Sequence, residues 1–221
     1  MTEPASARPV EARWPVVLAI LSVIVLLTAM PGRIRIFPVW FPIALGALVI
    51  VPTAVCGLLP GKPVWLRIER LFMLIFFVIT LAGSIVSQAN LITAMISRSS
   101  EISGVQLLAS SIAVWVTNVL AFSLLYWQMD RGGPEARTGG TTLKPDWLFP
   151  QDGASPDDFP MDWRPAFLDY LSLGFNTSTA FSPTDVLPLT RRAKMLMMLE
   201  SAISLVTIVV VASRAINILG S

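Results

Sequence analysis

Five stretches of this chain run for 19 or more residues with almost no charged side chain, and no other feature constrains the fold as strongly. A helix needs about 20 apolar residues to cross a hydrocarbon core of roughly 30 Å. Glu200 is the only charge inside any of the five. The stretches are residues 14–32, 36–61, 71–97, 102–129 and 195–213. The sequence therefore predicts an all-α, polytopic integral membrane protein with five transmembrane helices.

The composition supports this class and removes several kinds of chemistry. Only 14% of the 221 residues are charged, against about a quarter in a typical soluble domain. Histidine is absent and Cys56 is the only cysteine, which excludes zinc clusters, disulfide frameworks and His-dependent catalytic triads. We expect no enzyme activity, cofactor or metal site. The net charge of +2 comes from scattered basic residues, so no nucleic-acid partner is expected.

A sixth apolar segment, residues 170–184, is too short to span, because 15 residues reach only about 22 Å as a helix. It is interpreted as a short re-entrant or interfacial segment before the last helix. The third stretch becomes more polar after Ser84, so its span is expected to end near Ser87, with an interfacial turn of helix over residues 88–101. The first stretch also permits a cleaved signal peptide, but Pro31 at the cleavage position favours a retained helix.

The longest connection, residues 128–165, is rich in Pro, Gly and Asp, lacks helical periodicity and is predicted to be a solvated, flexible loop. Its acidic residues do not have the spacing of a calcium-binding EF-hand. The acidic residues considered are Asp152, Asp157, Asp158 and Asp162. The chain then divides into a polar tail (1–13), a three-helix region (14–101) and a C-terminal part (102–217) with the loop, the apolar segment 166–184 and a final helix.

Basic residues predict the orientation in the membrane. Twelve Lys and Arg residues fall on the side of the N-terminus and the long loop, and four on the other. The positive-inside rule then predicts a plasma or inner membrane protein with a cytoplasmic N-terminus and long loop and an external C-terminus. Tryptophans near the span ends are typical of an aromatic belt at the membrane surface. They are Trp14, Trp40, Trp65 and Trp127.

The segment before the last helix reads Asp169-Tyr-Leu-Ser-Leu-Gly-Phe-Asn-Thr-Ser-Thr-Ala-Phe-Ser-Pro-Thr-Asp185-Val-Leu-Pro188. Over roughly residues 105–217 the chain resembles the pore-helix, filter and inner-helix region of the potassium-channel superfamily. Thr177, Thr179, Asp185 and Pro188 match that family's filter-approach threonines, the aspartate after the filter and the following proline. The segment is also similar to one in uncharacterised multi-pass bacterial membrane proteins, a resemblance that implies no activity.

The resemblance fails at the filter, where Ser182-Pro183-Thr184 replaces Gly-Tyr-Gly. Glycines allow carbonyl groups to turn toward an ion and proline does not, so potassium selectivity is not implied. In that family the filter faces the outside of the cell and the C-terminus the inside. The distribution of Lys and Arg in this chain predicts the opposite orientation, and we follow it here. The candidate ion path uses hydroxyl groups and one carboxylate, from Thr177, Ser178, Thr179, Ser182, Thr184 and Asp185. The alternative is an ordinary turn in which Thr190 or Thr184 caps the final helix.

Glu200 is the second candidate site. An ionisable group inside a span costs about 2.5–3.5 kcal/mol on insertion scales, so it usually faces a protein interior or a partner charge. We expect it to line a polar seam with Asn118 and Thr117 of the fourth span. The alternative is a shallow glutamate paired with Arg191 or Lys194.

Two functional hypotheses follow. The first is an ion-channel-like oligomer with a degenerate pore loop that conducts or senses a small ion or solute. The second is a non-conducting structural protein whose long loop docks a partner. The bilayer is an expected partner under both hypotheses, and a second copy of the chain under the first.

Overall fold

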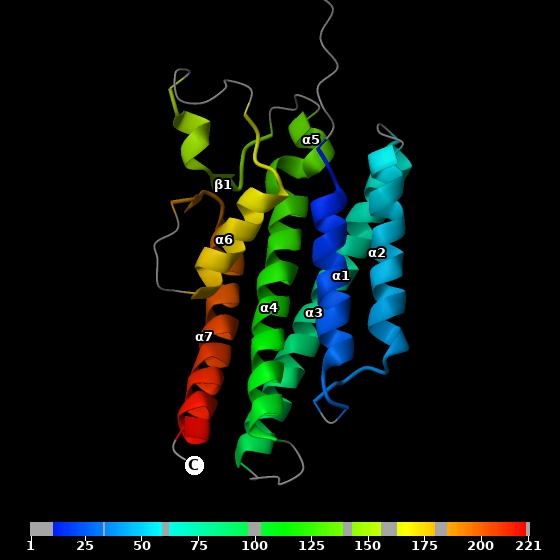
Figure 1. Ribbon diagram of the computed structural model, residues 1–221. Coiled ribbons are helices and arrows are strands. Elements are labelled where there is room, and N and C mark those ends of the chain that lie inside the picture. Colours follow the sequence, from blue (N-terminus) through cyan, green and yellow to red (C-terminus); the bar gives the residue numbers. More distant parts are fainter. Residues whose placement is uncertain are drawn as a thin grey trace, which may run out of the picture.

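The computed structural model describes residues 11–32, 34–58, 62–96, 103–138, 143–155, 163–179 and 185–219, which form a bundle of long helices (Figure 1). The helices are α1 (Trp14–Ala29), α2 (Trp40–Leu58), α3 (Pro63–Ile96), α4 (Gly104–Met129), α5 (Pro134–Thr138), α6 (Phe167–Thr179) and α7 (Arg191–Leu219). Two 3-10 turns, η1 (Asp130–Gly132) and η2 (Pro150–Gly153), and two short strands, β1 (Trp147–Leu148) and β2 (Leu187–Pro188), complete the described elements.

Four helices, α2, α3, α4 and α7, are long and apolar enough to cross a membrane, and α1 is a shorter apolar helix. This confirms the predicted all-α membrane architecture. With 16 residues, α1 is about 24 Å long, less than the predicted stretch 14–32. It nevertheless runs beside α2 and α4 along most of the bundle (Figure 1).

The structure shows what surrounds the more polar part of the third apolar stretch. α3 continues without a break to Ile96, nine residues beyond the predicted end of its span at Ser87. The polar residues that suggested an ending, Ser84, Ser87 and Gln88, are buried. The Gln88 side-chain amide donates to Thr207 Oγ1 of α7 at 2.5 Å. The polar residues in this part of α3 are therefore packed inside the bundle.

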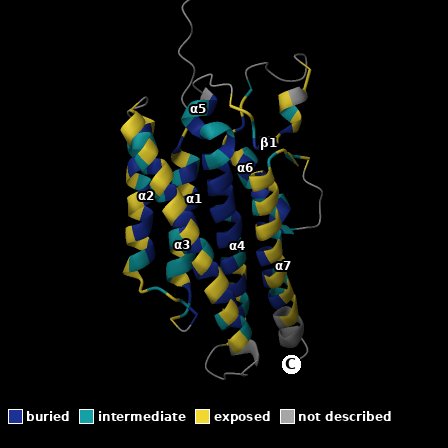
Figure 2. Cartoon of the chain, turned by 180° about the vertical axis from the view of Figure 1, so that it is seen from behind, coloured by how far each residue is buried: buried dark blue, intermediate teal, exposed yellow. Residues whose placement is uncertain are grey.

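α4 is the central helix of the fold. It packs against α1, α3, α6 and α7, and Figure 2 shows most of its ribbon in the colour of buried residues. Aromatic rings line its length, with Phe122 in edge contact with Phe77 and Tyr126 tilted against Trp147. The outer faces of α1, α2, α3 and α7 carry exposed apolar side chains, as expected for surfaces that meet lipid.

The described part of the long connection is folded, which contradicts the prediction of a flexible loop. It contains η1, α5, β1 and η2, and β1 pairs antiparallel with β2 just before α7. Asp157, Asp158 and Asp162 lie outside the described residues. Trp14 and Trp40 are exposed, whereas Trp127, near the end of α4, is fully buried inside the bundle.

The bundle has two distinct ends. The start of α1, α5, the β1–β2 pair and the start of α6 lie at one end, which we call the loop end, and α7 finishes at the opposite end (Figure 1). The fold therefore separates the long connection from the C-terminus across the thickness of the bundle.

This separation predicts opposite accessibility of two single cysteines in a Cys56→Ser background. Ser155→Cys in the loop-end connection and Ser221→Cys at the C-terminus should label with a membrane-impermeant maleimide from opposite faces of intact cells. The basic residues further predict that Ser221→Cys labels from outside. Labelling of both sites from one face would contradict the five-helix path of the chain.

Candidate functional site

α6 enters the bundle from the loop end and stops inside it. Its first residue, Phe167, lies in edge contact with Trp127 at the end of α4, and Phe175 meets Trp115 farther along α4. The 13 residues of α6 make it about 20 Å long, so even if it ran straight along α4 it would cover only part of a hydrocarbon core of about 30 Å. At β2 the chain is back at the loop end, where Leu187 pairs with Leu148. Residues 167–188 thus enter and leave at the same end.

The inner end of α6 meets Glu200, whose side chain is completely buried. Ser178 of α6 donates to Glu200 Oε1 at 2.8 Å, and the Tyr126 hydroxyl of α4 donates to Oε2 at 2.5 Å. The carboxylate therefore joins α4, α6 and α7. Arg191 and Lys194 are exposed and are not among its partners, so the alternative of a shallow, paired glutamate is wrong.

Polar contacts continue from Glu200 along one face of α7. The Asn118 side-chain amide donates to Ser204 Oγ at 2.8 Å and to the Glu200 carbonyl at 3.5 Å. Thr207, one turn farther, accepts from Gln88 of α3. Thr117 is buried, but its hydroxyl has no hydrogen-bond partner among the described residues. Of the two residues expected opposite Glu200, only Asn118 bonds to α7.

Some of the predicted pore-loop residues lie together at the inner end of α6, and others do not. Thr177 and Ser178 are buried at the inner end of α6, and the Thr177 carbonyl accepts from Ser201 of α7 at 3.1 Å. The Thr179 hydroxyl donates to the Asn176 carbonyl of its own helix. Ser182 and Thr184 lie outside the described residues, and Asp185 is exposed. Ser178 thus links the pore-loop candidates to Glu200, while Asp185 makes no bond to that cluster.

The sequence analysis also considered an ordinary turn in which Thr190 or Thr184 caps the final helix, and Thr190 does so. Thr190 Oγ1 accepts from the Ala193 amide at 3.2 Å and so caps the start of α7. The same hydroxyl donates to Asp146 at 2.6 Å.

Tyr126 was missed by the sequence analysis. The chain has only two tyrosines, Tyr126 and Tyr170, and each donates its hydroxyl to a buried carboxylate, Glu200 and Asp130 respectively. A buried phenol needs a hydrogen-bond partner. Two tyrosines near helix ends, in a chain with few polar residues, could therefore have indicated contacts with buried carboxylates.

A glycine allows α6 to approach so closely. A Cβ atom at Gly174 would lie 2.4 Å from Ser123 Oγ and 3.3 Å from both Glu200 Oε1 and the Val119 carbonyl. The small residue therefore lets α6 contact α4 and α7 at the depth of the buried carboxylate, as small residues do in membrane helix interfaces.

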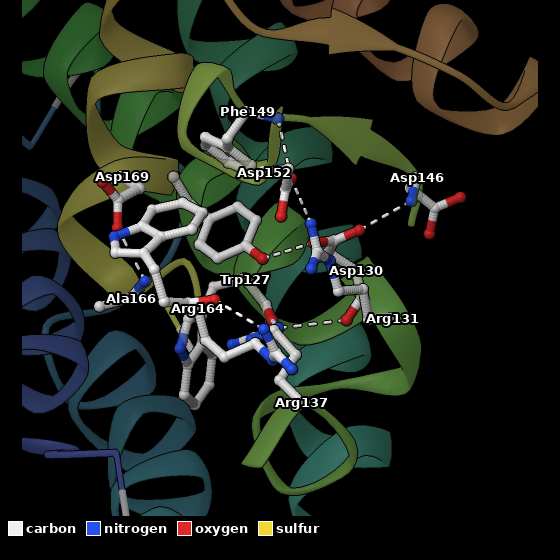
Figure 3. Close-up of polar contacts among 12 residues, drawn as sticks. Trp127, Asp130, Arg131, Arg137, Asp146, Phe149, Asp152, Arg164, Ala166 and Asp169 are labelled. Atoms are coloured by element: carbon white, nitrogen blue, oxygen red, sulfur yellow. Dashed lines mark hydrogen bonds and ion pairs between the residues drawn. The ribbon is translucent and has the colours of Figure 1, made fainter. Parts of the chain in front are cut away.

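A network of charged residues at the loop end holds the start of α6 (Figure 3). The buried Asp130 carboxylate accepts from the Tyr170 hydroxyl at 2.6 Å and from the Asp146 backbone amide at 2.7 Å. Arg137 donates to the carbonyls of Trp127 and Asp130 at 2.7 and 3.1 Å. Burial raises the pKa of the Tyr170 phenol well above its usual range.

The same network includes the N-terminal residues and the start of α7. Glu11 accepts from the Trp127 indole at 2.6 Å and from Arg137 at 3.2 Å. Asp146 binds Arg192 of α7 through two nitrogens at 2.7 and 2.5 Å. The starts of α6 and α7 are thereby fixed, α6 through Asp130 and α7 through Asp146.

No protein-family model matches the chain, and no curated protein or solved structure is significantly similar to it. Within the described residues there is also no group of three or more Cys, Asp or Glu side chains that could hold a metal ion. The functional interpretation therefore depends on the geometry around α6 and Glu200.

Replacing Gly174 with alanine should loosen α6. The added methyl group meets Ser123 and Glu200, and such overpacking typically costs about 1–3 kcal/mol. We expect a lower thermal unfolding temperature in detergent for Gly174→Ala, with partial recovery in the double variant Gly174→Ala, Ser123→Gly. Gly32→Ala is the matched control because no atom lies within 4 Å of its added methyl group. Equal effects of the two alanine substitutions would contradict this packing.

Asp130→Asn should destabilise the loop end by about 1–3 kcal/mol, because the amide group cannot accept from both Tyr170 and the Asp146 backbone. The measurement is thermal unfolding at pH 7. Asp185→Asn changes the same chemical group at an exposed position and should leave stability unchanged. A wild-type unfolding temperature for Asp130→Asn would show that the network contributes nothing to stability.

Proposed function

We propose that this protein is a pore-loop-type membrane protein that conducts a small cation as an oligomer. One observation carries the proposal: α6 is a short helix that enters the bundle from the loop end and stops inside it, with its C-terminal end against the buried Glu200. In the proposed orientation, the loop end faces the cytoplasm and the C-terminus lies outside the cell membrane.

The direction of α6 favours a cation over an anion. The C-terminal end of a helix carries a partial negative charge of about half an electron, and this end of α6 points toward the middle of the membrane. Glu200 adds an acidic group at the same depth, with only hydroxyl donors around it. Half-helix ends of this kind are a general way of stabilising ions near the membrane midplane.

A single chain does not form a complete ion path across the membrane. α6 covers only part of the membrane thickness and is flanked by α4 and α7 of its own chain. The proposal therefore requires further copies around an axis beside the α6–α7 connection. Exposed apolar side chains on α7, including Met195, Met198, Leu205 and Val209, leave that helix free to pack against another copy.

Selectivity between alkali cations is expected to be poor. The sequence Ser182-Pro183-Thr184 lacks the glycines that let backbone carbonyls replace a potassium hydration shell. Ions would instead meet hydroxyl groups and water, so sodium and potassium should pass at similar rates.

Flux into liposomes containing the purified protein tests the proposal. Wild type should raise sodium and potassium flux above empty liposomes. Ser178→Ala and Glu200→Gln, which alter the carboxylate contact, should change flux by about tenfold, equivalent to about 1.4 kcal/mol in barrier height. Asp185→Asn should lower flux most at low salt, because attraction by an exposed charge is screened by ions.

The matched control is Ser22→Ala, which removes an exposed hydroxyl from α1. It should conduct like wild type. Wild-type flux at the level of empty liposomes would refute conduction and favour the alternative, a structural protein whose loop end docks a partner.

A further inference from the structure

A second polar site lies at the loop end, away from Glu200. A cavity of about 320 Å³ opens between the first turns of α3 and the η1–α5 segment. It lies at the end of the bundle where α3 begins and α4 finishes (Figure 1). The residues that matter for its chemistry are Leu66, Glu69, Arg70, Gln128 and Glu135.

One buried acceptor in the inner wall of the cavity has no hydrogen-bond donor in the described part of the chain. Gln128 is only 5% exposed, and its oxygen Oε1 has no hydrogen-bond partner among the described residues. Leaving such a buried acceptor unpaired costs about 1–3 kcal/mol. An N–H group of a ligand that reached this oxygen would satisfy it.

Two carboxylates and two guanidinium groups lie in and around the cavity, so their formal charges sum to zero. Arg13 donates to Glu69 and, at 3.1 Å, to Glu135, which places two carboxylates beside one guanidinium. Arg70 is exposed at the cavity and donates to the Gly132 carbonyl, which leaves further N–H groups available. Two acids and two arginines suit a ligand that carries one positive and one negative group.

The cavity continues into a lipid-facing surface. Leu66, Arg70 and Leu74 follow one another at four-residue spacing, so they lie along one stripe of α3. Farther from the loop end, Leu71, Leu74 and Val78 are 56%, 49% and 54% exposed. Trp65, in the first turn of α3, is a residue type that collects at membrane surfaces. The cavity thus lies beside exposed apolar side chains of α3.

We propose that this cavity binds the headgroup of a phosphoethanolamine lipid. The ammonium group faces Glu69, Glu135 and the Gln128 oxygen, the phosphate lies on Arg70, and the acyl chains follow the exposed face of α3. A choline headgroup has three methyl groups in place of N–H donors and leaves Gln128 unpaired. A purely anionic headgroup brings no cation to the two carboxylates. The proposal does not depend on ion conduction.

Native mass spectrometry of the delipidated, full-length protein in detergent tests this site. Titration with a phosphoethanolamine lipid should give one tightly retained molecule, bound about tenfold more tightly than the phosphocholine lipid with the same chains. Arg70→Gln and Glu135→Gln should each reduce that preference at least severalfold. Arg70 is exposed, so Arg70→Gln leaves the buried residues in place, and its unfolding temperature shows the cost of losing the bond to the Gly132 carbonyl.

Arg67→Gln is the matched control, because Arg67 is exposed on the same helix and does not line the cavity. It should retain the wild-type preference. Equal affinity for the two lipids, or a preference unchanged in both Arg70→Gln and Glu135→Gln, would overturn the proposal. Chain-free phosphoethanolamine binding as tightly as the lipid would overturn the lipid assignment and identify a soluble ligand.

Discussion

The buried carboxylate of Glu200 is the interaction on which the inner part of the structure depends. It accepts from Tyr126 of α4 and Ser178 of α6 while it belongs to α7, so one side chain joins three helices. In a hydrocarbon environment an acidic group is costly unless protein donors surround it. Its neighbours are therefore specified in type and distance, which explains why Gly174, which has no side chain, lies against it.

The loop end repeats this arrangement with ion pairs added. Asp130 accepts from Tyr170 as Glu200 accepts from Tyr126, and Arg137 and Asp146 extend the contacts to the N-terminal residues and to α7. α6 is thereby anchored at both ends by a hydroxyl donating to a buried carboxylate. A helix too short to span the membrane needs such anchors, because lipid exposes no polar partner for its ends.

The sequence predicted those parts of the structure that depend on local composition. Charge-free stretches predicted the long helices, and the 15-residue length of 170–184 excluded a sixth span. Glu200 was identified as a candidate site because a charge inside a span is rare. What the sequence did not predict depends on partners distant in the chain. Glu11 bonds to Arg137, and Gln88 bonds to Thr207, and neither pair shares a motif or a spacing. Composition alone therefore misread the loop and did not predict the contact between α3 and α7.

The same reasoning explains why a pore-loop resemblance and a missing glycine filter are compatible. A re-entrant helix depends on contacts behind it, here Ser178 with Glu200 and Tyr170 with Asp130, whereas ion selectivity depends on the backbone in front of it. The two parts are physically separate, so a chain can keep the first and change the second. Ser182-Pro183-Thr184 differs from Gly-Tyr-Gly in sequence at the proposed filter, whereas the contacts that hold α6 in the described part of the chain are made by Tyr170 and Ser178.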